Sequence, residues 1–187
     1  MGELKDYSGK YMPELKCDDF SKETLITLLQ EYARALLALD GFWNTAVRKR
    51  YGDEISLECE TDAWLAYAPF IYPKFAKLLN IKTETVLDAL KVWQMTPDGY
   101  QAAGQYQCDV EVKNENDVIF TINYCPQLQW FEKKAPEQII PICHHLEEPI
   151  MQADFDVICK GIQVIPLKLP PRARQDEPAC IWQFKKD

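Results

Sequence analysis

The sequence has few of the residues on which several common protein classes depend. Only seven of its 187 residues are glycine, and it contains no Gly-x-Gly-x-x-Gly, no phosphate-binding Walker loop and no Gly-x-Ser-x-Gly elbow. Basic residues are outnumbered, with 21 Lys and Arg against 29 Asp and Glu, so the net charge is −8. We therefore expect neither a nucleic-acid partner nor an anionic membrane, because both are bound through positively charged surfaces.

A long apolar run and a secretory leader are also not found. Charges and prolines interrupt every apolar stretch before it could span a bilayer, and the first residues are polar. Gly2 is present, but Asp6 stands where a myristoylation signal requires Ser or Thr. We therefore expect a cytoplasmic protein. Its seven cysteines are widely spaced, with no Cys-x-x-Cys pair, so they are expected to be free thiols.

Apolar residues make up 47% of the chain, which is enough for a sizeable core in one domain spanning residues 1–187. Residues 1–20 are interpreted as an irregular arm, residues 21–98 as a helical part and residues 99–187 as an α+β part. Ser21 is a good N-cap for the first helix.

The helical part contains several stretches with apolar residues at helical spacing. The first stretch either kinks at Gly41 or runs on to a stop at Gly52, which suits the position after a helix. A second helix is expected over about 57–67, with Pro69 and Pro73 each opening a new helix. A further helix begins near residue 83.

The pattern changes to strict alternation after residue 99. Segments with strand character lie at 106–113, 118–124, 162–167 and 179–184. The first of these is expected to be half-buried, because apolar and polar residues alternate along it. Residues 126–155 are interpreted as mostly helical. The order predicts an α+β fold, with N-terminal helices followed by an antiparallel sheet of about four strands and a helical insertion between two hairpins.

The most distinctive local feature is Cys125-Pro126, which follows the strand that ends at Tyr124. Pro126 suits the first position of a helix, so Cys125 is expected at or near the N-cap. Unpaired backbone N–H groups and the helix dipole stabilise an anion there, which predicts a thiol with a lowered pKa that is nucleophilic or metal-binding. A buried cysteine that closes the strand is the alternative.

A second candidate site is the segment 143–148, which holds both histidines of the chain. On a helix, Cys143 and Glu147 share one face a turn apart, and His144 shares the neighbouring face with Glu148. A thiolate or imidazole beside a carboxylate suits a metal site or acid–base chemistry. A solvated helix face is the alternative. Cys180, in the last strand, is interpreted as core on its own.

Five motifs together carry a family resemblance. They are the segment 32–51, the segment 64–69, Tyr124-Cys125-Pro126 with the later Cys143, Pro170-Pro171, and the Cys-x-Trp-x-Phe motif that begins at Cys180. In this order they resemble an uncharacterised family of bacterial cytosolic proteins, which implies no particular activity.

The order of Cys125, Cys143 with Glu147, and Cys180 also resembles, more distantly, two further families. These are the L-2-amino-thiazoline-4-carboxylic acid hydrolases and the 4-vinyl reductase ligand-binding domains. The first resemblance implies opening of a C–N bond in a small sulfur heterocycle. The second implies binding of a small ligand or metal, often in a dimer.

Three hypotheses follow. The first is a binding protein with a cysteine-lined site for a small ligand or a metal such as zinc, held by Cys125, Cys143, Cys180 and His144 or Glu147. The second is a thiol-dependent hydrolase whose catalytic residues are Cys125, Cys143 and Glu147, with Cys125 as nucleophile and Glu147 or His144 as proton carrier. The third is a non-catalytic dimerisation domain, a homodimer, whose cysteines are core.

Overall fold

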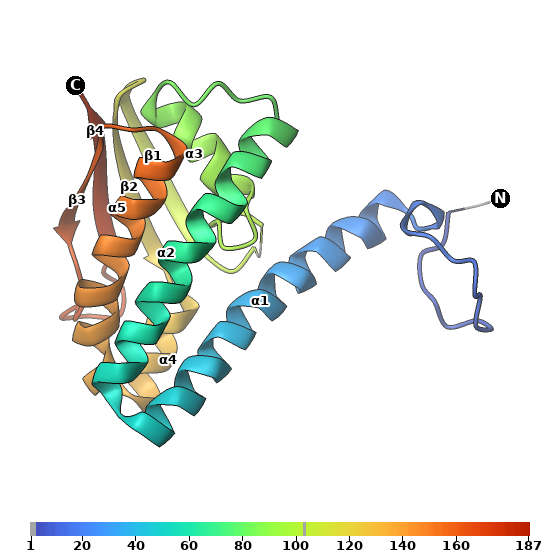
Figure 1. Cartoon of the computed structure of the whole chain (residues 1–187), viewed down its shortest axis with the longest axis horizontal. Helices are drawn as coiled ribbons and strands as arrows, with labels where there is room; N and C mark the ends of the chain where they lie inside the picture. The colour runs from blue at the N-terminus through green and yellow to red at the C-terminus, as the bar shows by residue number, and fades with distance from the viewer. Residues whose placement is uncertain (1–2, 103) are drawn as a thin grey trace.

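The computed structural model describes residues 3–102 and 104–187 (Figure 1). Its α-helices are α1 (Lys22–Tyr51), α2 (Asp53–Leu78), α3 (Val86–Met95), α4 (Pro126–Lys134) and α5 (Glu147–Ile158). Its strands are β1 (Gln107–Asn114), β2 (Asp117–Tyr124), β3 (Ile162–Lys168) and β4 (Cys180–Lys186). Short helical turns lie at Cys17–Asp19 and Pro136–Gln138, and a π-helical turn at Pro141–Leu146.

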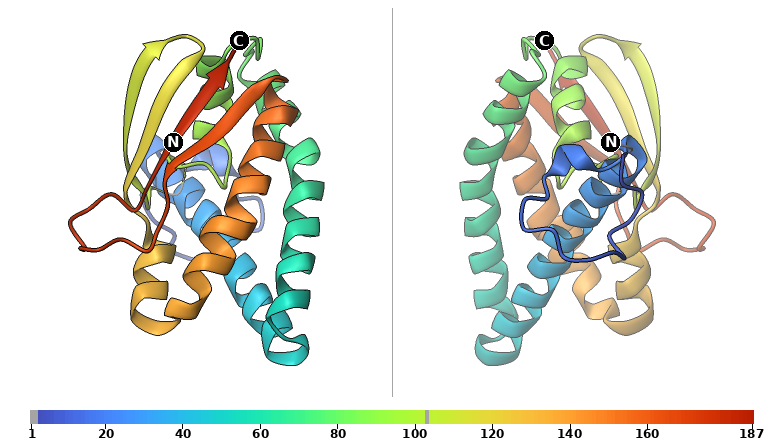
Figure 2. Two further views of the ribbon diagram at one scale, coloured as in Figure 1. Left: turned by 90° about the vertical axis from the view of Figure 1, so that its left-hand side faces the viewer. Right: turned by 90° about the vertical axis from the view of Figure 1, so that its right-hand side faces the viewer.

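The four strands form one antiparallel sheet in the order β1-β2-β4-β3. Two hairpins, β1–β2 and β3–β4, meet at the β2–β4 pair, and the α4–α5 segment is inserted between them along the chain. Figure 2 shows the helices gathered against one face of this sheet. The α+β prediction, with its helical insertion between two hairpins, is confirmed.

The first helix begins and ends where the capping residues predict. The Ser21 side chain accepts a hydrogen bond from the backbone N–H of Thr24, and the helix then passes through Gly41 without a break to Tyr51. Gly52 follows with a φ of 90°, a conformation that favours glycine. The chain turns there into α2, and the N-terminal part of α1 extends away from the sheet (Figure 1).

The expectation that Pro69 and Pro73 each open a new helix is wrong. Both prolines lie inside α2, which continues from Asp53 to Leu78. Each proline removes one backbone hydrogen bond, but the buried Ala68 and Tyr72 hold this stretch against the core. Tertiary packing therefore compensates for the missing hydrogen bonds.

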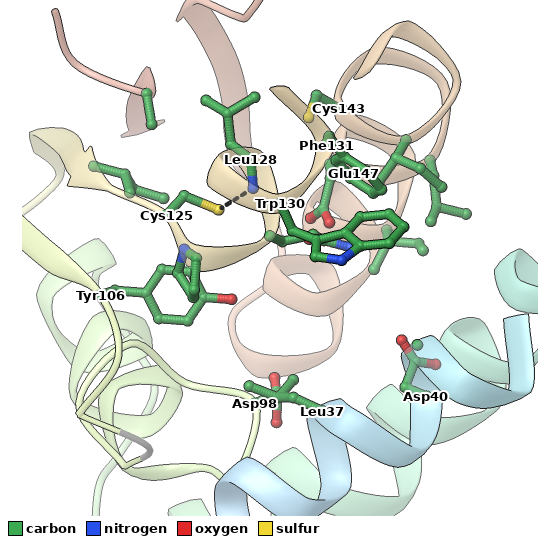
Figure 3. A pocket seen from close by; sticks show the side chains of 18 of the residues that line it. Leu37, Asp40, Asp98, Tyr106, Cys125, Leu128, Trp130, Phe131, Cys143 and Glu147 are labelled. Atoms are coloured by element: carbon green, nitrogen blue, oxygen red, sulfur yellow. Dashed lines mark hydrogen bonds between the residues drawn. The ribbon is translucent and has the colours of Figure 1, made fainter. Parts of the chain in front are cut away.

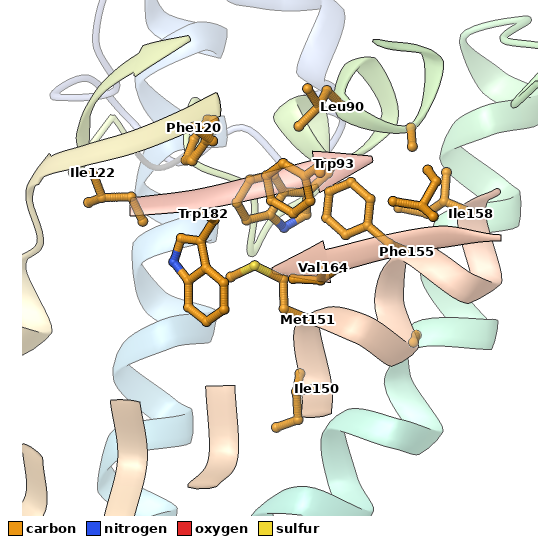
Figure 4. Packing of buried hydrophobic residues seen from close by; sticks show 14 of the residues in the cluster. Leu90, Trp93, Phe120, Ile122, Ile150, Met151, Phe155, Ile158, Val164 and Trp182 are labelled. Carbon is orange, nitrogen blue, oxygen red and sulfur yellow. The ribbon is translucent and has the colours of Figure 1, made fainter. Parts of the chain in front are cut away.

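The core is built on aromatic side chains between the helices and the sheet (Figure 4). Phe155 of α5 stacks on Phe184 of β4, with ring centroids 4.3 Å apart. Trp93 of α3 contacts Phe120 of β2 edge-on at 5.3 Å. Each such buried ring contributes about 2–3 kcal/mol through removal of apolar surface from water. These contacts attach α3 and α5 to the two central strands.

The expectation of a half-buried first strand is also wrong. Val110 and Val112 of β1 are 42% and 52% exposed, whereas Val118 and Phe120 of β2 are fully buried. The helices pack on β2, β3 and β4, so β1 is an uncovered edge.

Within the described residues no helix is long and apolar enough to cross a membrane.

Replacing Gly99 with alanine is expected to destabilise the protein by about 1–3 kcal/mol, because overpacking forces the backbone to shift. A Cβ at Gly99 would lie 1.8 Å from the carbonyl oxygen of Trp93. Gly41 is the matched control, because a Cβ there would meet no atom within 4 Å. Gly41→Ala should leave the stability unchanged or raise it by up to about 1 kcal/mol in urea denaturation. Equal effects of the two substitutions would contradict this account.

Candidate functional site

A cavity of about 620 Å³ lies between α1, α2, α4, α5 and the neighbouring end of the sheet (Figure 3). Its volume falls within the range of about 300–1,000 Å³ that is typical of small-molecule sites. Aromatic rings from several elements line it, among them Trp64, Trp93, Tyr106, Trp130 and Trp182. The cavity can therefore enclose a small, mainly apolar molecule.

Cys125, Cys143 and Cys180 all line this cavity, as does Glu147. Burial raises the pKa of the Cys143 thiol, and charges on Glu147, Cys125 or Cys180 raise it further, so the four groups lie close together. Segments far apart in sequence are brought together here, because Cys125 precedes α4, Glu147 opens α5 and Cys180 opens β4.

Cys125 occupies the position that its sequence predicts. It is the N-cap of α4, and its Sγ accepts a hydrogen bond from the backbone N–H of Leu128 at 3.4 Å. Pro126 is the first residue of the helix. Figure 3 shows the thiol directed towards the Leu128 nitrogen, with the Tyr106 ring close by.

The expectation of a lowered thiol pKa is contradicted. Burial raises the pKa of Cys125 to about 11, and this outweighs the opposing effect of the Leu128 N–H. Burial likewise raises the pKa of Cys180 to about 12, although Trp182 Nε1 donates to its sulfur at 3.2 Å. The apolar lining disfavours the charged thiolate more than the helix terminus stabilises it. These thiols are therefore protonated and poorly nucleophilic at neutral pH.

His144 is directed elsewhere. Its Nε2 donates to the backbone carbonyl of Pro170 at 2.5 Å, and it is not among the residues that line the cavity. The segment Pro141–Leu146 winds as a π-helical turn, so the α-helical spacing used for the expectation does not apply to its side chains. Cys143 and Glu147 nevertheless both face the cavity.

Over residues 3–102 and 104–187, no set of three or more His, Cys, Asp or Glu side chains is arranged to hold a metal ion. Cys125, Cys143, Cys180 and His144 therefore form no ready ligand set. The zinc site remains a prediction that this geometry does not support.

A group of acids that the sequence did not reveal also lines the cavity. The hydroxyl of Tyr72 donates to Asp98 Oδ2 at 2.8 Å, and that of Tyr67 donates to Asp98 Oδ1 at 3.2 Å. Asp154 of α5 lies beside the same Tyr72 hydroxyl and is only 6% exposed. Its Oδ1 is buried without a hydrogen-bond partner among the described residues. Burial raises the pKa of Asp154 to about 8 against the opposing effect of the Tyr72 hydroxyl, and the nearby Asp98 and Glu147 add to the increase.

A second acidic pair lines the cavity between α1 and α2. Glu60 is 3% exposed and accepts a hydrogen bond from the Asn44 side chain. Burial and the neighbouring Asp40 raise its pKa to about 8. Burial raises the pKa of Glu147 as well, to about 7. The cavity thus combines apolar walls with carboxyl groups whose pKa values are raised by burial.

Comparison with known proteins places the chain in one family. The family of unknown function DUF6125 matches residues 18–186, which is most of the sequence. This chain belongs to the DUF6125 family. The resemblance to an uncharacterised family is thereby confirmed. No curated protein and no solved structure matches, so the likeness to the hydrolases and to the 4-vinyl reductase domains has no support.

In this DUF6125 chain the loop before β4 is held in place by a buried ion pair. Arg172 Nε and Nη2 donate to the two carboxylate oxygens of Glu132 on α4 at 2.7 and 2.9 Å. Arg172 Nη1 also donates to the backbone carbonyls of Gln175 and Glu177. The arginine side chain is 2% exposed. It fixes the loop that leads into Cys180 at the cavity wall.

One signal in the DUF6125 sequence could have revealed Asp154. Asp154 lies on the face of α5 that buries Ile150, Met151, Phe155 and Ile158. Burying a carboxylate within an apolar helical stripe costs free energy, so such a residue usually has a hydrogen-bonding partner or belongs to a binding site. Asp98 carries no comparable signal, because aspartate is common in turns.

Proposed function

We propose that this protein binds a small, mainly apolar molecule in the cavity lined by Cys125, Cys143 and Cys180. The observation that carries this proposal is the cavity itself, about 620 Å³ in volume and walled by tryptophan, tyrosine and cysteine side chains. Such walls favour apolar ligands through the hydrophobic effect, and the few polar groups orient the ligand. The raised pKa values of Cys125 and Cys180 favour a binding role over nucleophilic catalysis.

Ligand binding can be measured through the tryptophans of the cavity. Addition of the neutral probes indole or 2-phenylethanol is expected to change the protein fluorescence and to raise the melting temperature. 2-Phenylethanol is the better probe for fluorescence, because indole is itself the chromophore of tryptophan. Cys143→Phe should weaken binding about tenfold or more, because the added ring occupies the cavity and each 1.4 kcal/mol is tenfold in affinity. Cys17→Phe is the control, since Cys17 is exposed and outside the cavity. Binding equally strong in both variants, or no binding of any probe, would overturn the proposal.

A dimerisation domain is the second candidate, and one observation favours it. Leu29, Tyr32 and Leu39 of α1 are 66%, 69% and 65% exposed. Their spacing places them on one face of the helix, which leaves an apolar stripe open to solvent. The homodimer stays a prediction, and this stripe of α1 is the surface through which two copies would associate.

A further inference from the structure

Asp154 has a buried carboxyl group whose hydrogen bonding is incomplete among the residues that the structure describes. The carboxyl is 6% exposed, lines the cavity and leaves Oδ1 without a hydrogen-bond partner in the described part of the chain. The Tyr72 hydroxyl beside it has one proton, which is already donated to Asp98 at 2.8 Å. A buried acceptor left unpaired costs about 1–3 kcal/mol, so a ligand that donates to it would recover that free energy.

The acidic groups that line the cavity indicate which charge the donor group of a ligand would carry. Five carboxyl groups line the cavity, those of Asp40, Glu60, Asp98, Glu147 and Asp154.

Arg34 and Arg48 also line the cavity, and both have acidic partners on the helices. Arg34 pairs with Glu31, and Arg48 lies 4.0 Å from Asp53. Among the residues that line the cavity, the five carboxyl groups outnumber these two arginines. A positively charged group entering the cavity would meet a surplus of acceptors.

The aromatic side chains that line the cavity indicate the chemistry of the uncharged part of the ligand. Trp93, Tyr100, Tyr106 and Trp182 line the cavity together with the acids, and aromatic faces attract cations as well as apolar groups. A bare metal ion does not fit, because the described residues contain no group of ligands arranged to hold one. An organic cation with an aromatic or apolar body satisfies both the walls and the acids.

We propose that the cavity binds an arylalkylamine, an alkyl ammonium that carries an aromatic ring, whose ammonium group donates to Asp154 Oδ1 and to Asp98, with its ring among the tryptophan and tyrosine side chains. This inference rests on the proposed function, since it names the class of ligand for the same cavity. Binding draws the carboxyl of Asp154 into its charged form and releases its proton to solvent.

The groups that face Asp154 determine how the affinity of the cavity for an ammonium ligand varies with pH. They are Tyr67 and Tyr72 of α2, Asp98 after α3 and Glu147 on α5 itself. All are acids or hydroxyls, so none supplies a positive charge. Affinity for an ammonium group is therefore expected to rise between about pH 6 and pH 8.5 as Asp154 loses its proton.

Phenethylamine and 2-phenylethanol are a matched pair of probes that differ in the charged group. Wild-type protein is expected to bind phenethylamine at least about tenfold more tightly than the alcohol in isothermal titration at pH 8. Asp154→Asn should abolish this preference, so that the two probes bind with affinities within about twofold of each other. Asp156→Asn, an exposed position on the same helix, should preserve it.

The outcomes separate the two proposals. If the alcohol and the amine bind equally, or if the preference survives in Asp154→Asn, the amine inference is overturned while the binding function stands. If neither probe binds, the proposed function fails. Should Asp154→Asn not fold, the pH series with wild-type protein decides: a flat affinity for phenethylamine between about pH 6 and pH 8.5 overturns the inference.

Discussion

The free energy of unfolding is expected to fall by several kcal/mol as the pH rises from about 5 to about 8.5. Asp154 and Glu60 are the main cause, because both are buried and each has its pKa raised to about 8. In the unfolded chain both carboxyls ionise near their ordinary values, close to pH 4. Between those values and pH 8 the folded state binds more protons than the unfolded state, so stability falls as protons are withdrawn.

Asp154→Asn isolates one of these contributions. An amide carries no proton that titrates in this range, so the variant should show a shallower decline and should exceed the wild type in stability at about pH 8.5. Urea denaturation at several pH values between 5 and 8.5 provides the measurement. Asp156→Asn, which alters an exposed carboxylate on the same helix, should keep the wild-type slope. A wild-type stability that is constant over this range would contradict the burial argument.

Cys125 is expected to react with iodoacetamide about 100-fold more slowly at neutral pH than a thiol of ordinary pKa, because only the thiolate attacks. Its pKa of about 11 leaves very little thiolate at pH 7.5. Peptide mapping by mass spectrometry gives the rate for each cysteine separately. Cys17 is the internal reference, because it is exposed.

The same measurement decides between binding and hydrolysis. A thiol-dependent hydrolase needs a nucleophile activated by a base or by a lowered pKa. His144 is hydrogen-bonded to the Pro170 carbonyl and does not line the cavity, which leaves Glu147, with its pKa of about 7, as the candidate base. Alkylation of Cys125 as fast as that of Cys17 would restore the hydrolase hypothesis, with Cys125, Cys143 and Glu147 as its catalytic residues.

Much of the fold could be predicted because its signals are local. Ser21 and Gly52 mark the ends of α1 through capping geometry, which depends on only a few neighbouring residues. Alternation along residues 118–124 predicts β2 for the same reason. The continuous α2 could not be predicted, because the packing of Ala68 and Tyr72 offsets the local effect of two prolines.

The candidate site could be predicted only in part. The order of the three cysteines and Glu147 in the sequence suggested that they meet, and they do line one cavity. The acids Asp98 and Asp154 were missed, because they lie on separate elements and meet only through Tyr72 of a third. Spacing along the chain carries no information about such a cluster.

The sequence by itself determined the α+β order of elements, the acidic charge and the place of Cys125 at the start of a helix. Only the tertiary structure decided the chemistry of that thiol. A helix N-terminus lowers a thiol pKa when solvent can reach it, whereas burial among apolar side chains raises it. In this chain Cys125 is half-buried at the wall of a cavity lined mainly by apolar and aromatic side chains, so desolvation dominates. The depth of burial is a property of the assembled fold, and no local motif records it.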